Sequence, residues 1–521
     1  MVSRHKNGSL TNKRALTFGI IRLGKNQHTP KGVPNLMIQH FEAAENPNEA
    51  LNVSFVNAIK TLDISGLLSQ CGIRKDSRTI AGESSGSKRS AFEIFQFLLL
   101  MVFQGCNLYR FLGSKKQDIA CSKSTYHRFL SNEHYNWRRF ITLLAAKVVC
   151  VFSKLTKEDR FSALVIDDSV IGRKRSKSVE LLAYIFDHVV NKSVNGFNLL
   201  TIGWTDGFSF IPVAFNMLSS AKQEKRFKEI NPKIDKRTNG YKARMAAITK
   251  KPDAALQMIR SALDAGISAQ YILMDTWFTN EPFIKNILSE GLDVIGMLKN
   301  NKQMYHYKGK LYNLDSLAAY FAKMSIPGDI LGSAVVKTRY EHISVKIVFV
   351  RNRNKKSEYI MILSTDCALS DAEIIRRYGY RWSIECCFKV CKSLLKLGKE
   401  FQPINYDTTV SSTALVFTRY TILEWIRRQN SDPHSLGEIF FFCYDDVRDI
   451  ELSDALDRLV SIMAEGISNG TITMDESVRV EILDWYISQP VFIQNICKDS
   501  LVNAGFVAAD NHNGDELSTA A

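Results

Sequence analysis

The sequence has no apolar run long enough to cross a membrane. Its longest apolar stretches are FLLLMVF at 97–103 and the segment 141–152, which Lys147 interrupts. A membrane-spanning helix needs about 20 apolar residues. The opening residues, MVSRHKNGSL, hold no apolar segment of the kind found in a secretory signal. These absences argue against a membrane or secreted protein, and we expect a cytoplasmic one.

The cysteines lack any recognisable pattern. Ten are scattered over 521 residues, with no CxxC pair and no Cys/His cluster at zinc-finger spacing. A disulfide framework is therefore not expected. Cys386, Cys387 and Cys391 lie together, and on a helix they are predicted to be small buried hydrophobic residues. Redox sensitivity beside an active site is the alternative.

What the sequence does have is a globular balance and a strong positive charge. Hydrophobic residues make up 45% and charged residues 23%, which is typical of a folded protein with two to four domains at this length. The net charge is +15, and it is concentrated in residues 1–33, in residues 222–251 and in RKRSK at 173–177. Such charge favours a polyanionic partner. A solvated surface would explain a charge run equally well.

The chain changes in character along its length. Residues 1–40 are predicted to be a flexible basic arm. Residues 41–158 show helical periodicity, as in AFEIFQFLLLMVF, and the basic stretch 114–130 suits a helical DNA-binding domain, such as a helix-turn-helix variant. Residues 431–521 are expected to form a helical C-terminal region with a disordered tail after about residue 507.

Strand and helix patterns alternate between these ends. Three strands are predicted first, in FSALVIDD and in FNLLTIGWTDGFSFIPVAF, whose two strands meet at an Asp-Gly turn at 206–207. A helix at about 243–265, the strand 270–275, the helix NEPFIKNILSE and the strand LDVIGML follow. This order predicts a mixed sheet flanked by helices. It forms a core of residues 159–299 and 367–430, with an antiparallel β insertion at 300–366.

A long helix is predicted to begin at Ser370, where Ser370 and Glu373 form a capping box, and to end near Gly398. Within it Tyr378, Arg381, Glu385 and Lys392 are spaced to fall within an arc of about 60° on one face. A stripe suited to packing on the sheet lies beside that face: Ile384, Cys387, Phe388, Cys391 and Leu395. The two cations could bind phosphate, although an ordinary salt-bridged helix would have the same charges.

Three carboxylates are placed where a metal site could use them. Asp168 ends the first predicted strand, Asp275 ends a later strand, and Glu385 lies on the long helix. Strand ends are the usual location of sites in α/β folds, and carboxylate oxygens are the ligands that Mg²⁺ and Mn²⁺ prefer. Two such ions can cleave a phosphodiester by activating water and stabilising the leaving oxygen.

The signature Tyr-x₂-Arg-x₃-Glu-x₆-Lys resembles that of the insertion-sequence-four family of bacterial DDE transposases. Tyr378, Arg381, Glu385 and Lys392 match it without a gap, and VIDDS at 165–169 and YILMDTWFT at 271–279 resemble the segments that hold the family's two aspartates. The segments IDKRTNGYKARMAAI and LDVIGMLK are also similar to family members. The likeness covers roughly residues 160–430.

The resemblance implies an α/β fold with a ribonuclease-H-like mixed-sheet core, a β-strand insertion and flanking helical domains. It further implies a triad of Asp168, Asp275 and Glu385 that binds two Mg²⁺ or Mn²⁺ ions. Tyr378, Arg381 and Lys392 would contact double-stranded DNA at the transposon ends. The family acts by cut-and-paste, as a homodimer on DNA, and so in the bacterial cytoplasm at the nucleoid. A hairpin intermediate is neither indicated nor excluded.

Several alternatives stay open in the sequence. Asp167 adjoins Asp168, and on a strand the two side chains point to opposite faces; the family pattern of Asp before Ser or Thr favours Asp168. Trp277 could stack on a base or be a core residue of the next helix. The loop cations Arg173, Lys174 and Arg175 could contact phosphate or simply face solvent. A nuclease without strand transfer, or a non-catalytic DNA-binding derivative, would share much of this sequence.

Overall fold

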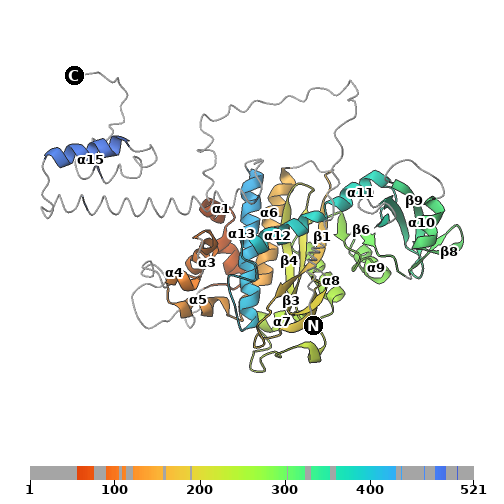
Figure 1. The fold of residues 1–521 in the computed structure, drawn as a ribbon, viewed down its shortest axis with the longest axis horizontal. Helices are drawn as coiled ribbons and strands as arrows, with labels where there is room; N and C mark the ends of the chain where they lie inside the picture. The colour runs from red at the N-terminus through yellow and green to blue at the C-terminus, as the bar shows by residue number, and fades with distance from the viewer. Residues whose placement is uncertain are drawn as a thin grey trace, which may run out of the picture.

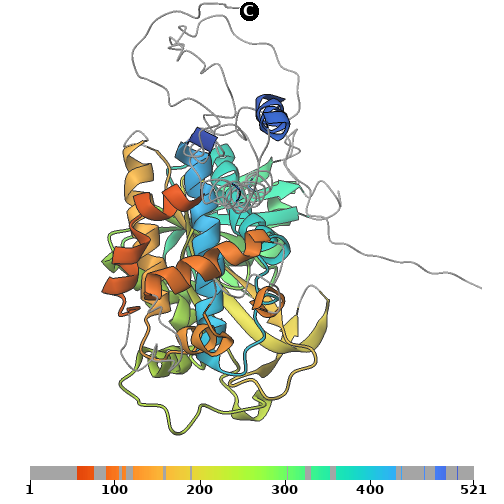
Figure 2. The same cartoon turned by 90° about the vertical axis from the view of Figure 1, so that its left-hand side faces the viewer.

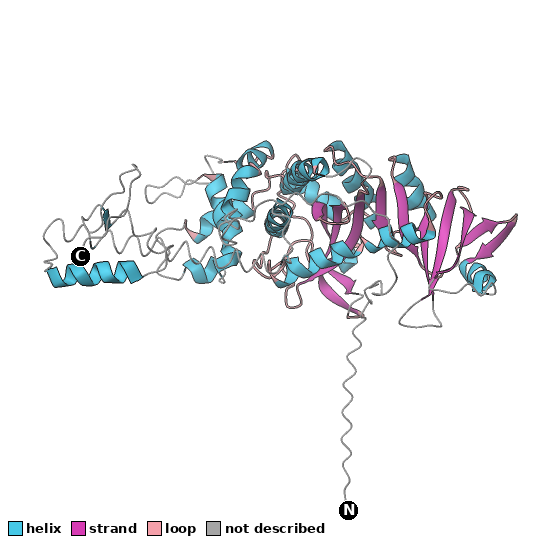
Figure 3. Cartoon of the chain, turned by 90° about the horizontal axis from the view of Figure 1, so that it is seen from above, coloured by secondary structure: helices cyan, strands magenta, loops and turns pink. Residues whose placement is uncertain are grey.

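The computed structural model describes residues 55–74, 90–104, 108–112, 121–155, 160–187, 190–301, 303–322, 330–351 and 359–429, together with 436, 463, 476–488 and 501–502. The predicted basic arm at 1–40 and the tail after 507 lie outside these residues. Figure 1 shows the fold, and Figure 3 shows that the strands gather in one half of the molecule, whereas helices lie both beside them and in the other half.

An 11-stranded mixed sheet forms the framework. Its order is β2-β3-β1-β5-β6-β11-β10-β9-β7-β8, and β4 also pairs with β3. The pairs β1–β5 and β5–β6 are parallel, while the other pairs are antiparallel. The strands are β1 (Ala163–Gly172), β2 (Ala183–Asp187), β3 (Lys192–Thr205), β4 (Phe210–Leu218), β5 (Tyr271–Met274), β6 (Asp293–Leu298), β7 (Met304–Tyr307), β8 (Lys310–Asn313), β9 (Ile330–Thr338), β10 (Ser344–Arg351) and β11 (Tyr359–Ser364). This is the mixed α/β fold that the sequence predicts.

Helices precede, interrupt and follow these strands. The first group is α1 (Phe55–Thr61), α2 (Ile64–Gln70), α3 (Ala91–Leu100), η1 (Met101–Gln104), α4 (Leu108–Leu112), α5 (Lys123–Leu130) and α6 (Trp137–Lys154). Among and after the strands come η3 (Gln223–Lys225), α7 (Asn239–Ala247), α8 (Lys251–Asp264), α9 (Glu281–Ser289), α10 (Leu314–Ala322), α11 (Asp371–Gly379), α12 (Trp382–Ser393), α13 (Tyr406–Gln429) and α15 (Glu476–Ser488). Within the described ranges, no helix is both long and apolar enough to cross a bilayer.

The helix α13 lies at the centre of the molecule. It contacts α1, α3, α5 and α6 from the N-terminal helices, and also α12 and β4 (Figures 1 and 2). Nearly every side chain from Tyr406 to Ile426 is buried, as expected for a helix surrounded by protein on all sides. All nine residues of β4 are buried as well, beneath α6, α8 and α13. The N-terminal helices and the sheet therefore share one hydrophobic core.

Most of the predicted strands are confirmed. The Asp-Gly turn joins β3 to β4, and Gly207 there has a φ of +84°. A Cβ atom on Gly207 would lie 2.9 Å from the Tyr380 ring, so both conformation and space require glycine. The prediction missed β2, so four strands, not three, come first. The antiparallel strands predicted within 300–366 are present and continue the same sheet through β11 and β6, with the unpredicted helix α10 among them.

Three predicted helix features are wrong. The segment at 243–265 is two helices, since α7 ends at Ala247 and Pro252 lies in the first turn of α8. The helix from Ser370 is also two, α11 and α12. The Ser370 hydroxyl accepts from the Glu373 amide, but the Glu373 carboxylate binds Arg376 and Arg377, so the capping box is incomplete. Finally, α12 ends at Ser393, so Gly398 (φ +70°) lies in the following loop.

Candidate active site

Two acidic residues occupy the middle of the strand β1. The prediction that Asp168 ends this strand is wrong, because β1 continues to Gly172. Asp167 is buried and Asp168 is partly buried, and their side chains point to opposite faces. The last parallel pair between β1 and β5 is Ile166 with Met274. The next residues are Asp167 on β1 and Asp275 after β5. Their carboxylates therefore lie beside each other, and the charge of Asp275 acts on Asp167.

Asp275 directly follows β5, as predicted. Its carboxylate accepts hydrogen bonds from the backbone amides of Trp277 (3.0 Å) and Phe278 (3.3 Å). Its carbonyl oxygen accepts from the Thr279 hydroxyl at 2.6 Å. These bonds fix the turn after β5 and the orientation of the Asp275 carboxylate within it.

Arg381 contacts both Asp167 on β1 and Glu385 on α12. Its guanidinium lies 2.6 Å from a carboxylate oxygen of Asp167 and 3.6 Å from one of Glu385. The Arg381 side chain is 15% exposed and that of Glu385 is 40% exposed. The structure thus brings together Asp167, Asp275 and Glu385 around one arginine.

The pKa values of the strand acids reflect this crowding. Burial raises the pKa of the Asp167 carboxyl to about 7; Arg381 opposes the shift, and the charges of Glu385 and Asp275 add to it. Burial also raises the pKa of Asp275, against the two amide hydrogen bonds and Arg381, and the charge of Asp168 adds to the rise. The cluster therefore has more negative charge than the single arginine offsets, which favours binding of a further cation.

Asp168 has a different partner. The ammonium of Lys251, at the start of α8, lies 2.8 Å from its carboxylate, and each side chain is 19% exposed. The same ammonium lies 4.4 Å from the ring centroid of Trp277. Trp277 is 46% exposed and lies in a turn, so the alternative that it is a core residue of the following helix is wrong.

The residues of the predicted signature span a helix junction. At the end of α11 and the start of α12 the backbone bonds are of the i to i−3 type, as in Arg381 to Tyr378 and Ile384 to Arg381. The Tyr378 hydroxyl is buried with no hydrogen-bond partner in the described part of the chain. Burial raises the pKa of Tyr378 to about 12, against the charge of Arg381. Tyr378 thus packs among the charged groups, whereas the resemblance predicts a DNA contact.

The other basic residues predicted to contact DNA differ in their surroundings: two contact the protein and two are exposed. Lys392 donates to the Ser169 hydroxyl at 2.6 Å, two residues beyond Asp167 on β1, and burial lowers the pKa of its ammonium. Arg173 donates to the carbonyl of Phe401 at 3.1 Å. Lys174 and Arg175 lie in the predicted loop and are exposed. Only these last two face solvent as the sequence suggested.

The packing stripe of α12 is confirmed. Its five members are all buried: Ile384, Cys387, Phe388, Cys391 and Leu395. They hold α12 against β1, β4 and α13, which leaves Glu385 on the side of the acids. Cys386 is exposed, so the prediction of burial fails for this one of the three neighbouring cysteines.

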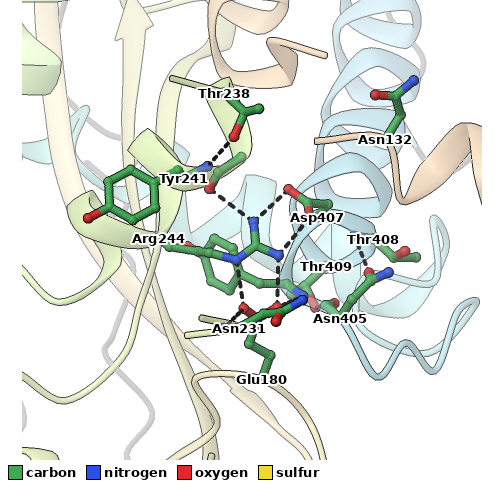
Figure 4. Close-up of polar contacts among 12 residues, drawn as sticks. Asn132, Glu180, Asn231, Thr238, Tyr241, Arg244, Asn405, Asp407, Thr408 and Thr409 are labelled. Carbon is green, nitrogen blue, oxygen red and sulfur yellow. Dashed lines mark hydrogen bonds and ion pairs between the residues drawn. The ribbon is translucent and has the colours of Figure 1, made fainter. Parts of the chain in front are cut away.

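The basic run 222–251 contains a buried ion-pair network that sequence reasoning missed. Arg244 on α7 binds Glu180 (2.7 Å) and Asp407 (2.6 Å), and all three side chains are buried (Figure 4). Glu180 precedes β2 and Asp407 lies in the first turn of α13, so the network joins three segments distant in sequence. The glutamate also accepts from the amides of Asn231 and Tyr406. Arg244 therefore belongs to the core, although it lies in a basic run whose charge suggests a polyanionic partner.

The donors fit a hard divalent ion by type, because every candidate ligand is a carboxylate. Among the described residues, however, no three acidic, histidine or cysteine side chains lie close enough together to hold an ion as they stand. Arg381 and Lys251 occupy the carboxylates of Asp167 and Asp168 instead. For an ion to bind, Arg381 and Lys251 would have to lose part of their contacts with Asp167 and Asp168.

Two family models match this region of the chain. Residues 89–312 match the model described as DDE superfamily endonuclease, and residues 240–401 match the model described as Transposase DDE domain. The first range includes Asp167, Asp168 and Asp275, and the second includes Asp275 and Glu385. No curated protein matches the chain. The acidic cluster on a mixed sheet and the two overlapping matches together indicate a transposase or endonuclease of the DDE class.

Proposed function

We propose that the protein is a DNA transposase of the insertion-sequence-four type. It would bind the terminal inverted repeats of an insertion sequence, cleave the DNA ends by metal-dependent hydrolysis and join the freed 3′-hydroxyls to target DNA. The observation that carries this proposal is that the carboxylates of Asp167 on β1, Asp275 directly after β5 and Glu385 on α12 gather near Arg381. A structural ion pair would need only one of these acids.

The proposed ligands are Asp275, Glu385 and one of the neighbours Asp167 and Asp168. The sequence pattern favours Asp168, whereas the contacts of Asp167 with Arg381 and its closeness to Glu385 favour Asp167. When bound, two Mg²⁺ or Mn²⁺ ions would activate the attacking water or hydroxyl and stabilise the leaving oxygen. The amides of Trp277 and Phe278 keep the Asp275 carboxylate oriented for this task.

The cations near the acids would hold the DNA backbone. Arg381 can bind a phosphate with two parallel hydrogen bonds once its carboxylate contacts are relaxed. Lys392 would act from the end of α12, and the exposed Lys174 and Arg175 from the loop after β1. Tyr378 supports Arg381 by packing, and would reach DNA only if the junction between α11 and α12 moved.

The flanking regions have roles consistent with this activity. The helices within residues 41–158 would bind the transposon end, and the strands within 300–366 would form the β insertion of a ribonuclease-H-like core. Two copies of the chain would hold two ends, since cut-and-paste needs both ends at one target. The role of residues 41–158 rests on their helical periodicity and the basic stretch 114–130, and the other two assignments rest on the sequence resemblance.

Two other activities would use the same cluster. A nuclease would cut without strand transfer, and a binding-only derivative would do neither. The test is to find inverted repeats beside the gene, prepare pre-cleaved ends from them, and incubate these with a target plasmid in Mg²⁺. We expect joined products from the wild type and none from Glu385→Gln. Cleavage without joining would identify a nuclease, and binding without cleavage a derivative.

A further inference from the structure

Trp277 is a large apolar side chain exposed beside the acidic cluster. It is 46% exposed, although Phe278, the next residue, is 1% exposed. A tryptophan left open to solvent in this way retains unburied apolar area on a large aromatic ring. Its place two residues after Asp275 puts that surface next to the proposed site of phosphodiester chemistry.

The Trp277 side chain is also well anchored. Its backbone amide donates to the Asp275 carboxylate at 3.0 Å, so the turn cannot change without disturbing that acid. The buried ring of Phe278 lies 4.8 Å from the indole, at an interplanar angle of 74°. The indole is therefore presented at a fixed position relative to Asp275, as a binding platform requires.

Lys251 adds a cation to this platform. Its ammonium lies 4.4 Å from the Trp277 ring centroid and 2.8 Å from the Asp168 carboxylate. An ammonium has three N–H donors, and the Asp168 oxygen uses one of them. Another can point at the Trp277 ring, and a third can reach a phosphate oxygen, since the Lys251 side chain is 19% exposed.

We infer that Lys251 and Trp277 form a nucleotide-binding subsite beside the acids, in which an unpaired base stacks on the indole and its phosphate pairs with the ammonium. The inference rests on the proposed function, because it takes DNA as the ligand. The base must be unpaired and displaced from its neighbours, since both of its faces are covered inside a duplex. A strand end or a locally opened duplex next to the cut provides such a base.

The test compares two DNA probes in EDTA, so that no strand is cut. One is a blunt duplex of random sequence, and the other is the same duplex with a short 3′ single-stranded extension that carries 5-iodouracil. Affinity is measured by fluorescence anisotropy, and photocrosslinked residues are identified by mass spectrometry. The variants are Trp277→Ala, Trp277→Phe, Lys251→Met and Lys251→Arg, with Trp485→Ala as a matched control at another partly exposed tryptophan.

We expect the extended probe to crosslink to Trp277. Trp277→Ala should abolish that crosslink and weaken binding of the extended probe by about tenfold, with little effect on the blunt duplex. Trp277→Phe and Lys251→Arg should retain most of the affinity, and Lys251→Met should reduce the salt dependence by about one phosphate contact.

Equal loss on both probes, or crosslinks only at other aromatic residues, would overturn the subsite. It would also be overturned if Trp485→Ala had the same effect as Trp277→Ala. Failure of the wild type to bind either probe is a different result, because it would overturn the proposed function itself.

Discussion

Arg381 lies 2.6 Å from Asp167, although the two residues are 214 positions apart in the chain. The contact joins the junction before α12 to the middle of β1. It also places the arginine between Asp167 and Glu385, so that one guanidinium links the two carboxylates.

Replacing Glu385 should separate cleavage from binding. Glu385→Gln keeps the shape of the side chain but removes the charge that a divalent ion needs. We expect metal-dependent cleavage to fall by more than about a hundredfold, which is the upper range for loss of a residue that merely supports a metal ligand. DNA binding, measured by gel shift, should stay within about twofold. Cleavage at the native rate would show that Glu385 is not a ligand.

The two neighbouring aspartates can be distinguished by paired substitutions. Asp167→Asn removes the partner of Arg381, and Asp168→Asn removes the partner of Lys251. If the contacts identify the ligand, Asp167→Asn should abolish cleavage and Asp168→Asn should retain more of it. The reverse order would confirm the sequence prediction of Asp168. Titration of Mn²⁺ binding to each variant gives a second measurement that does not depend on activity.

Substituting Tyr378 distinguishes a packing role of this side chain from a contact between its hydroxyl and DNA. Its hydroxyl is buried and makes no well-aligned hydrogen bond in the described part of the chain, although the nearby Arg381 guanidinium opposes the rise in its pKa, so Tyr378→Phe removes a buried polar group that the fold satisfies poorly. We expect the midpoint of thermal unfolding to stay the same or rise, and affinity for DNA to stay within about twofold. A loss of affinity of about tenfold would instead support a hydroxyl contact to phosphate, as the resemblance predicts.

The sequence predicted most strands of the sheet and the strand segments that carry the acids, because both depend on local patterns, but it did not show which of Asp167 and Asp168 lies beside Arg381. Short apolar runs that end in carboxylates are visible in one dimension, and so is the stripe that buries one side of α12. The break between α11 and α12 was missed because the periodicity continues through the 3₁₀-type junction at Tyr378 and Arg381. Neither the pairing of Lys251 with Asp168 nor that of Arg244 with Glu180 leaves a local signal. These contacts join distant segments, and a lysine or arginine in a basic run looks the same whether it faces solvent or the core.

The buried network around Arg244 should be important for stability. Arg244→Met leaves Glu180 and Asp407 buried without their partner, and breaking a buried pair in this way costs about 3–5 kcal/mol. Urea unfolding of the purified variant measures the loss. The matched control is Arg237→Met, because Arg237 pairs with Asp235 at the surface and its side chain is 91% exposed. No measurable change is expected there, and similar losses in both variants would contradict a special role for the buried network.

The same network predicts how stability depends on pH. Burial of Glu180 would raise its pKa, but hydrogen bonds from Arg244 and from the amides of Asn231 and Tyr406 outweigh burial and lower it. The pKa of glutamate in an unfolded chain is about 4.3. Ionised Glu180 therefore stabilises the fold fully above that pH, and its contribution is lost as the pH falls through the lower value of the folded state.

Comparison of the wild type with Glu180→Gln tests this dependence. The difference in free energy of unfolding should be largest near pH 7 and should shrink as the pH falls below about 4.3. Glu229→Gln is the control, since Glu229 pairs with Arg226 while 45% of its side chain is exposed, and its substitution should give a much smaller difference at every pH. A difference for Glu180→Gln that stayed constant into the acid range would mean that the fold depends on the shape of this side chain and not on its charge.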